Sequence, residues 1–110
     1  AVDCQIVAVW FQDGTDVLNI INLNGSTQTL VFEFISNAGV EQGSSGSRVV
    51  APFERHHMTA TQVYAMSTVP LAFSSSYVAI TTLGQVGNFL AAVRHGGVTR
   101  EVGCVGLHPS

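Results

Sequence analysis

Short apolar stretches alternate with turn-forming residues along the whole chain. Val, Thr, Ile and Phe dominate the apolar stretches, and the segments between them read QDGT, NGST, SNAG, VAPF, TVPL, LGQVG and HGG. β-Branched and aromatic residues favour strands, whereas Gly, Pro, Asn and Asp favour turns. The pattern therefore predicts strands near residues 5–11, 16–23, 28–36, 47–51, 57–65, 74–82, 87–95 and 98–104.

Seven to eight short strands at this spacing are typical of an all-β sandwich or barrel. We expect a single antiparallel β-sandwich domain over residues 1–110, because a second core would leave each part too small to bury enough surface. RHGGVTR predicts a Gly-Gly hairpin, since both central positions of a type I′ turn need a positive φ. EQGSSGS predicts a flexible loop. GNFLAAVRHGG ends in glycine as a capped helix would, but its length and neighbours favour a strand.

Several of the predicted strands are apolar on both faces. In the strand at 28–36, Phe32 and Phe34 lie on one face, and Val31 and Ile35 lie on the other. A sheet of a sandwich needs only one buried face, and monomers rarely expose large apolar patches. The sequence therefore predicts self-association. The expected assembly surface consists of Val7, Val9, Trp10, Phe11, Val31, Ile35 and Leu90.

The charge content narrows the choice of partners. Charged residues make up 10% of the chain, against about 25% in an ordinary soluble domain, and the net charge is −3. Four scattered arginines and no lysine form neither a basic stripe for nucleic acid nor a polybasic membrane anchor. No apolar run is long enough to span a bilayer. We expect no nucleic-acid partner and no membrane insertion.

Two cysteines lie almost at the two ends of the chain, Cys4 and Cys104. A disulfide between them would tie the first strand to the last, which suits an oxidising compartment. The alternative is a pair of buried free thiols. The chain begins AVDCQ without methionine, as expected after removal of a signal peptide. We favour the disulfide and an extracellular location.

The stretch PFERHHMTATQVYAM holds the residues most often found at active sites. Neighbouring side chains of a strand point to opposite faces, so His56 and His57 diverge and do not share a metal ion. His57 is expected on the outer face, and a metal site would need His95 or His108 to come close. Asp3, Asp13 and Asp16 could bind calcium, but the twelve-residue loop motif is missing.

Nucleophile and haem motifs are also missing. Ser74, Ser75 and Ser76 lack the G-x-S-x-G elbow and are expected to bond to the local backbone at a strand entrance. GCVGLHPS lacks the C-x-x-C-H pattern of haem attachment. We therefore expect no enzyme activity, no catalytic residue, no cofactor and no metal ligand.

Three segments carry a resemblance to a known class of module. INLNGSTQTLVFEFISNAGV, RVVAPFERHHMTATQVY and SSSYVAITTLGQVGNFLAAV follow one another in the order found in bacterial surface and secreted immunoglobulin-like sandwich modules, which the chain resembles over residues 16–95. The resemblance implies an immunoglobulin-like topology. It also implies an adhesive, spacer or assembly role at the bacterial cell surface.

The function expected from the sequence is structural: a secreted subunit that associates with copies of itself into a surface filament or other homopolymer. The alternative is an extracellular adhesion module that binds surface glycans. Its aromatic platform would consist of Trp10, Tyr64 and Tyr77. For Trp10, packing in the core or in an interface is the competing interpretation.

Overall fold

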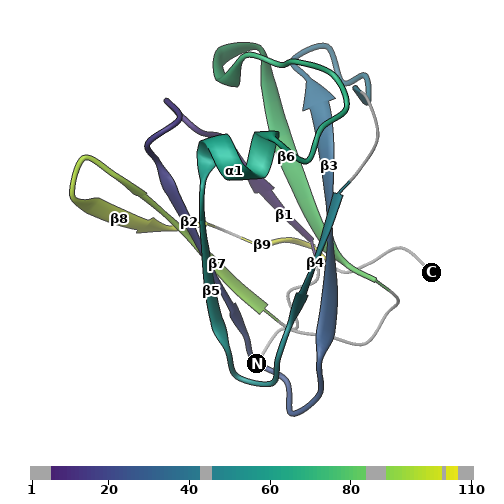
Figure 1. Cartoon of the computed structure of the whole chain (residues 1–110), viewed down its shortest axis with the longest axis vertical. Coiled ribbons are helices and arrows are strands. Elements are labelled where there is room, and N and C mark those ends of the chain that lie inside the picture. Colours follow the sequence, from purple (N-terminus) through teal and green to yellow (C-terminus); the bar gives the residue numbers. More distant parts are fainter. Residues whose placement is uncertain (1–5, 43–45, 84–88, 103, 107–110) are drawn as a thin grey trace.

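The computed structural model of the chain describes residues 6–42, 46–83, 89–102 and 104–106. The strands of this part form an all-β sandwich of two antiparallel sheets (Figure 1). One sheet has five strands in the order β4-β3-β6-β1-β9, and the other has four in the order β5-β2-β7-β8. Their bounds are β1 Ile6–Val9, β2 Val17–Asn22, β3 Gln28–Ser36, β4 Gly46–Val50, β5 Arg55–Thr59, β6 Ser76–Thr82, β7 Phe89–His95, β8 Val98–Glu101 and β9 Cys104–Gly106.

The core between the two sheets follows from alternation along the strands. In β3 every second residue is buried, so Leu30, Phe32 and Phe34 point inward while Val31 and Ile35 point outward. The same alternation in β2 and β6 buries Leu18 and Ile20, and Val78 and Ile80. Each buried aliphatic or Phe side chain contributes about 1.5–3 kcal/mol relative to an exposed one. The predicted division of residues 28–36 into two faces is confirmed.

A short helix closes one end of the sandwich, where the sequence predicts strand. The predicted strand at 57–65 ends at Thr59, and α1 (Ala60–Tyr64) continues it. Thr59 accepts from the backbone N–H of Gln62, and Gln62 accepts from the backbone N–H of Thr59. This capping box starts the helix and turns Ala60 and Val63 into the core. A one-turn 3-10 helix, η1 (Phe73–Ser75), precedes β6.

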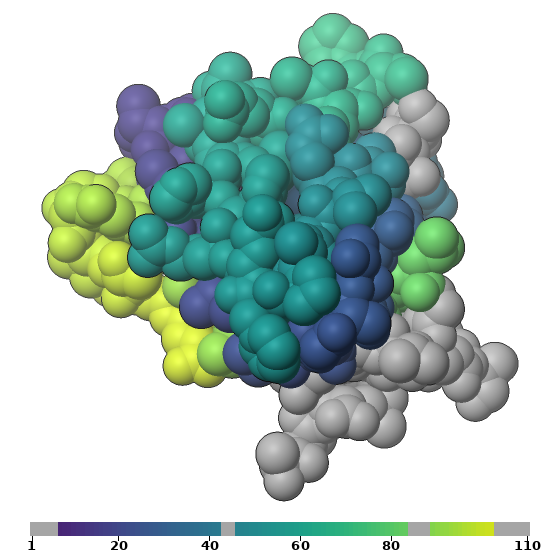
Figure 2. Space-filling view, turned by 60° about the horizontal axis from the view of Figure 1, so that its bottom comes forward, coloured from purple at the N-terminus to yellow at the C-terminus, as the bar shows by residue number. Residues whose placement is uncertain are grey.

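The turns match the sequence pattern closely. Gly96 and Gly97 both have positive φ values, 57° and 86°, so the predicted Gly-Gly hairpin between β7 and β8 is confirmed. This hairpin projects from the body of the molecule in both views (Figures 1 and 2). The strand favoured over a helix in GNFLAAVRHGG, residues 87–97, is also confirmed, as β7 over Phe89–His95. The strand predicted at 98–104 is interrupted, and its two ends, β8 and β9, pair in different sheets. Residues 43–45 of the predicted flexible loop lie outside the described residues.

Candidate functional site

Most of the described residues on the outer face of the five-stranded sheet are apolar. We call it the apolar face, and among the described residues it has two charged side chains, Glu33 on β3 and Glu41, which bridges Ile35. Val31 lies directly opposite Thr81, and Ile35 lies opposite Tyr77. Its described members are Ala8, Trp10, Thr29, Val31, Glu33, Ile35, Glu41, Ser47, Val49, Tyr77, Ala79 and Thr81.

The outer face of the four-stranded sheet is polar by comparison. Arg55 and His57 of β5, Arg94 of β7 and Glu101 of β8 lie on it. His57 contacts the side chain of Asn19 on β2 at 3.3 Å. The two faces therefore differ in charge although both strand sets are rich in Val and Ile. Of the two outer faces, the apolar face is therefore the one whose exposure to water is less favourable.

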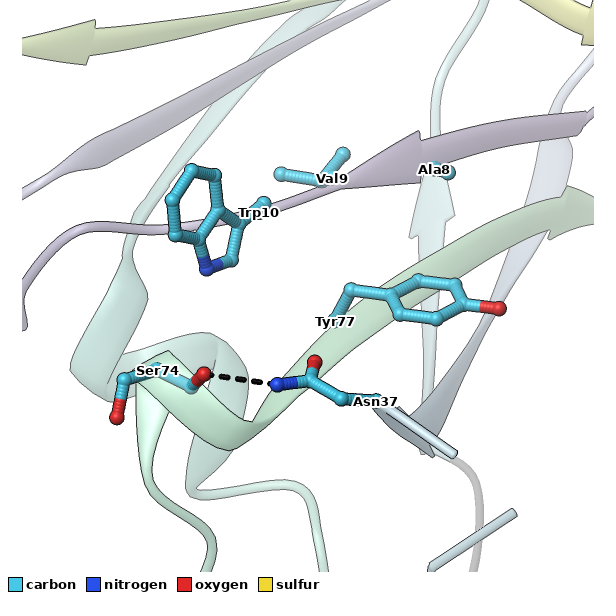
Figure 3. Close-up of a pocket in the computed structure, with 6 residues that line it drawn as sticks. All are labelled: Ala8, Val9, Trp10, Asn37, Ser74 and Tyr77. Carbon is cyan, nitrogen blue, oxygen red and sulfur yellow. Dashed lines mark hydrogen bonds between the residues drawn. The ribbon is translucent and has the colours of Figure 1, made fainter. Parts of the chain in front are cut away.

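A groove lies at one end of the apolar face (Figure 3). It is a shallow, open groove with a volume of about 390 Å³, within the range of about 300–1,000 Å³ for small-molecule sites. Trp10 is 65% exposed and lies across the groove from Tyr77. No charged side chain is among the described residues that line it, which are Ala8, Val9, Trp10, Asn37, Ser74 and Tyr77.

Hydrogen bonds hold the groove residues in place. The indole N–H of Trp10 donates to the carbonyl oxygen of Phe73 in η1 at 3.2 Å. The ring of Phe73 packs edge-on against Tyr64, with the ring centroids 4.7 Å apart. The amide N–H of Asn37 donates to the carbonyl oxygen of Ser74 at 3.0 Å. Trp10 is thereby connected through η1 to the part of the core where Tyr64 packs against phenylalanine rings.

Tyr64 belongs to that core and not to the groove. Its ring makes edge contacts with Phe11, Phe34 and Phe73, and its hydroxyl lies 2.9 Å from Oγ of Ser76. Burial raises the pKa of the Tyr64 hydroxyl. The sequence prediction of a platform made of Trp10, Tyr64 and Tyr77 was therefore wrong for Tyr64, because α1 carries this side chain inward. Trp10 and Tyr77 do come together.

A second cluster joins the turn before β2 to the end of β7. The buried carboxylate of Asp16 accepts from Nδ1 of His95 and, at 2.7 Å, from the backbone N–H of Gln12. Nδ1 of His95 also lies 3.8 Å from the carboxylate of Asp13. The hydrogen bond that His95 donates to Asp16, assisted by the charges of Asp16 and Asp13, raises the pKa of His95. Hydrogen bonds from Thr15 lower the pKa of Asp13.

Two carboxylates and an imidazole form a donor set that divalent cations accept. One ligand atom each from Asp13, Asp16 and His95 lies within 4.8 Å of the others. However, both Asp16 oxygens already accept hydrogen bonds within the protein. Arg100 is close enough to lower the pKa of His95, and its positive charge also opposes a cation. The cluster is therefore best understood as a tie between two strands.

The predicted assembly surface divides into three groups in the structure. Val31, Ile35 and Trp10 lie on the apolar face, as expected. Leu90 is 39% exposed but lies on the outer face of the other sheet. For the remaining three residues the prediction was wrong, because the alternation of β1 turns them into the core between the sheets. The buried residues are Val7, Val9 and Phe11.

The adjacent histidines diverge as the strand argument predicts. His57 is exposed next to Asn19, whereas His56 is half-buried and pairs with the buried Ile20. His95 bonds to Asp16 instead of approaching either of them. His108 and Asp3 lie outside the described residues.

The predicted serine role is confirmed for Ser75 and Ser76 by their side-chain hydrogen bonds. Oγ of Ser75 and Oγ of Ser76 donate to the carbonyl oxygen of Ala72 at 3.2 and 2.8 Å. The cysteines are untested. Cys4 lies outside the described residues, and of Cys104 only the backbone is described, paired with Val7. The disulfide therefore stays a prediction.

Sequence reasoning missed Asn37, Ser74 and the pairing of Asp16 with His95. SNAG is recognisable as a turn, but no periodicity indicates that this turn lies beside η1, 37 residues further along. Asp16 and His95 are 79 residues apart and meet only because β2 pairs with β7. The residue types were visible in the sequence, and the topology that brings them together was not.

Comparisons of the chain with protein-family models, with curated proteins and with solved structures found no match. None of the helices in the described part of the chain has the length and apolar character needed to cross a membrane. Fold and site together define an all-β sandwich with one apolar outer face that ends in an aromatic groove.

Proposed function

We propose that the chain is a secreted structural subunit without catalysis, which associates with copies of itself through the apolar face. The observation that carries the proposal is the contrast between the two outer faces. Arg55, Arg94 and Glu101 lie on one of them, whereas the charged side chains that the described residues place on the other are Glu33 and Glu41. A surface of this composition is more stable against a second protein surface than against water.

The free energies expected for burying the apolar face are those of a reversible contact. Val31 and Ile35 are half-buried and Val49 is 63% exposed, so each has apolar area left to bury. Full burial of such a side chain contributes about 1.5–3 kcal/mol, and burial of the part that is still exposed in the monomer contributes less. In a face-to-face contact each of these residues is buried twice, once in each copy. The total is comparable with the cost of association, about 4–15 kcal/mol, so assembly is expected to depend on concentration.

A filament needs a second contact besides the apolar face, since a face that meets its own copy closes a dimer. The edge strand β8 supports one. All four of its residues are exposed, Val98 is 57% exposed, and within the described chain β8 pairs with β7 alone. An exposed edge can accept a strand from a neighbouring molecule. We propose that this edge provides the repeat contact of a homopolymer.

The extracellular location and the kinship with immunoglobulin-like modules belong to the same proposal. The spacing of Cys4 and Cys104 and the low charge of the chain support an exported protein at the bacterial surface. The two antiparallel sheets agree with a sandwich of that general kind. A surface filament is the assembly that best fits these features.

Charge substitutions on the two faces test the proposal. Val31→Lys and Ile35→Lys place a charge on the apolar face, whereas Ile21→Glu changes a matched outward Ile on the other sheet, opposite Arg55. In light scattering after size exclusion, the two lysine variants should be monomers and Ile21→Glu should keep the wild-type mass. All three should retain the far-ultraviolet circular dichroism of the wild type. Equal masses for all four folded proteins would refute the proposed interface.

A further inference from the structure

The groove at the end of the apolar face combines features that the rest of the molecule does not share. It pairs an exposed indole with a second aromatic ring, and an amide side chain lies below them (Figure 3). The other strongly exposed aromatic side chain among the described residues, Phe53, is 68% exposed and does not line this groove. Exposure of Trp10 therefore needs an explanation of its own.

We propose that this groove binds a ring of a neutral saccharide. A pyranose ring has an apolar face of C–H groups and a rim of hydroxyls. The apolar face stacks on an aromatic ring, and the rim requires hydrogen-bonding groups beside that ring. Trp10 and Tyr77 supply the rings, and Asn37 supplies the amide. Trp10 and Tyr77 also belong to the apolar face, so a saccharide in the groove competes with self-association through that end of the face, although its binding does not require self-association.

The groove is organised before a ligand arrives. The bond from Trp10 to the carbonyl of Phe73 fixes the indole. The backbone N–H of Asn37 donates to Ser75 and its side-chain N–H donates to Ser74, at 3.1 and 3.0 Å. The side-chain oxygen of Asn37 is thereby turned toward the two rings (Figure 3). Groups already held in place lose little entropy on binding, which favours even a small ligand.

The charges in and around the groove indicate which class of saccharide it would bind. No described lining residue is charged. The charges that the described residues place on the same face are those of Glu33 and Glu41, which repel anions, and the chain as a whole has a net charge of −3. Sulfated or uronic acid sugars require Arg or Lys in the site. Neutral hexose or N-acetylhexosamine polymers fit the groove.

Fluorescence can test the inference directly, because Trp10 is the only tryptophan in the chain. The full chain is titrated with cellotetraose, maltotetraose, mannotetraose and chitotetraose, and with a heparin tetrasaccharide as the anionic comparison. We expect a saturable change in emission with at least one neutral oligosaccharide and none with heparin. Running the same titration on Val31→Lys separates the result from assembly, since Val31 lies outside the groove.

Calorimetry on variants then assigns the binding to the groove. Trp10→Ala should abolish measurable binding, and Asn37→Ala should weaken it about tenfold, the equivalent of one hydrogen bond. Phe53→Ala, an exposed aromatic elsewhere, should leave it unchanged. The inference is overturned if no neutral oligosaccharide binds, or if binding survives Trp10→Ala. It is equally overturned if the emission responds to protein concentration but not to sugar, since the groove would then be covered by another copy.

Discussion

Buried polar side chains anchor the ends of the strands in this protein. Asp16, Asn22, Gln28, Ser76 and Thr82 are buried, and every buried side-chain nitrogen and oxygen of the described residues has a hydrogen-bond partner. A buried polar group without a partner costs about 1–3 kcal/mol. These five residues therefore stabilise the fold together with the apolar core.

Asn22 at the end of β2 offers the sharpest test at this scale. Its side-chain N–H groups donate to the carbonyls of Ser26, Val50 and Ala51, at 2.9–3.1 Å. Asn22→Asp keeps the shape but turns a carboxylate toward these carbonyl oxygens. We expect the free energy of unfolding in urea to fall by about 3–5 kcal/mol, as for an unpaired buried charge. Asn19→Asp on the outer face should change it little. Equal effects of the two variants would contradict this account of Asn22.

His95 should make stability depend on pH. Its pKa is raised above 6.5, chiefly by the hydrogen bond to Asp16. A raised pKa means that the folded state holds the proton more tightly than the unfolded state. The stabilisation is therefore complete below the unfolded value and is lost as the pH rises through the folded pKa.

The measurement compares wild type with His95→Gln by urea unfolding at pH about 5.5 and about 8.5. The wild type should exceed the variant in stability by more at the lower pH. The variant also serves as the control for the other histidines, which titrate in both proteins. A difference that is the same at both pH values, or larger at the higher one, would show that protonated His95 does not stabilise the fold.

At the scale of elements, alternation and turn chemistry predict most of the sheet. Gly96 and Gly97 fix the hairpin locally, and the two faces of β3 follow from its sequence alone. The helix α1 was missed because Thr59, Thr61 and Val63 continue the alternation of β5 as if the strand went on. The signal that could have revealed it is Thr59 with Gln62 three residues later, a capping box.

Removing this cap tests whether it starts α1. Thr59→Ala deletes the hydroxyl that accepts from the N–H of Gln62. We expect a loss of about 1 kcal/mol in the free energy of unfolding, the usual cost of an N-cap. Thr99→Ala, in the exposed strand β8, is the matched control and should be close to neutral. If both substitutions cost the same, the helix starts without help from Thr59.

At the scale of the whole molecule, the sequence indicates an excess of apolar surface but not where it lies. Val7 and Val31 are equally apolar and equally placed in alternating strands, and only the pairing of the sheets decides which one is buried. Trp10 and Tyr77 were predicted to share an aromatic platform, but the sequence did not indicate that Asn37, from a third segment, lies beside them. Contacts of this kind require the topology.

The proposed disulfide also belongs to this scale. Intact-mass analysis without reductant should give a mass two hydrogens below that of the dithiol, owing to a bond between Cys4 and Cys104. Closing a loop of about 100 residues stabilises the fold by about 4–5 kcal/mol in the chain-entropy model, so reduction should lower the free energy of unfolding markedly. Alkylation of both thiols in the native, unreduced protein would exclude the bond.

Sedimentation velocity of the wild-type chain over a range of concentrations tests the central claim most directly. A self-associating subunit should sediment as species well above 11.6 kDa at micromolar concentration, and the weight-average sedimentation coefficient should rise with concentration. The apolar face would then be buried between copies. A single species of 11.6 kDa throughout that range would contradict the proposal that the chain is built for self-association.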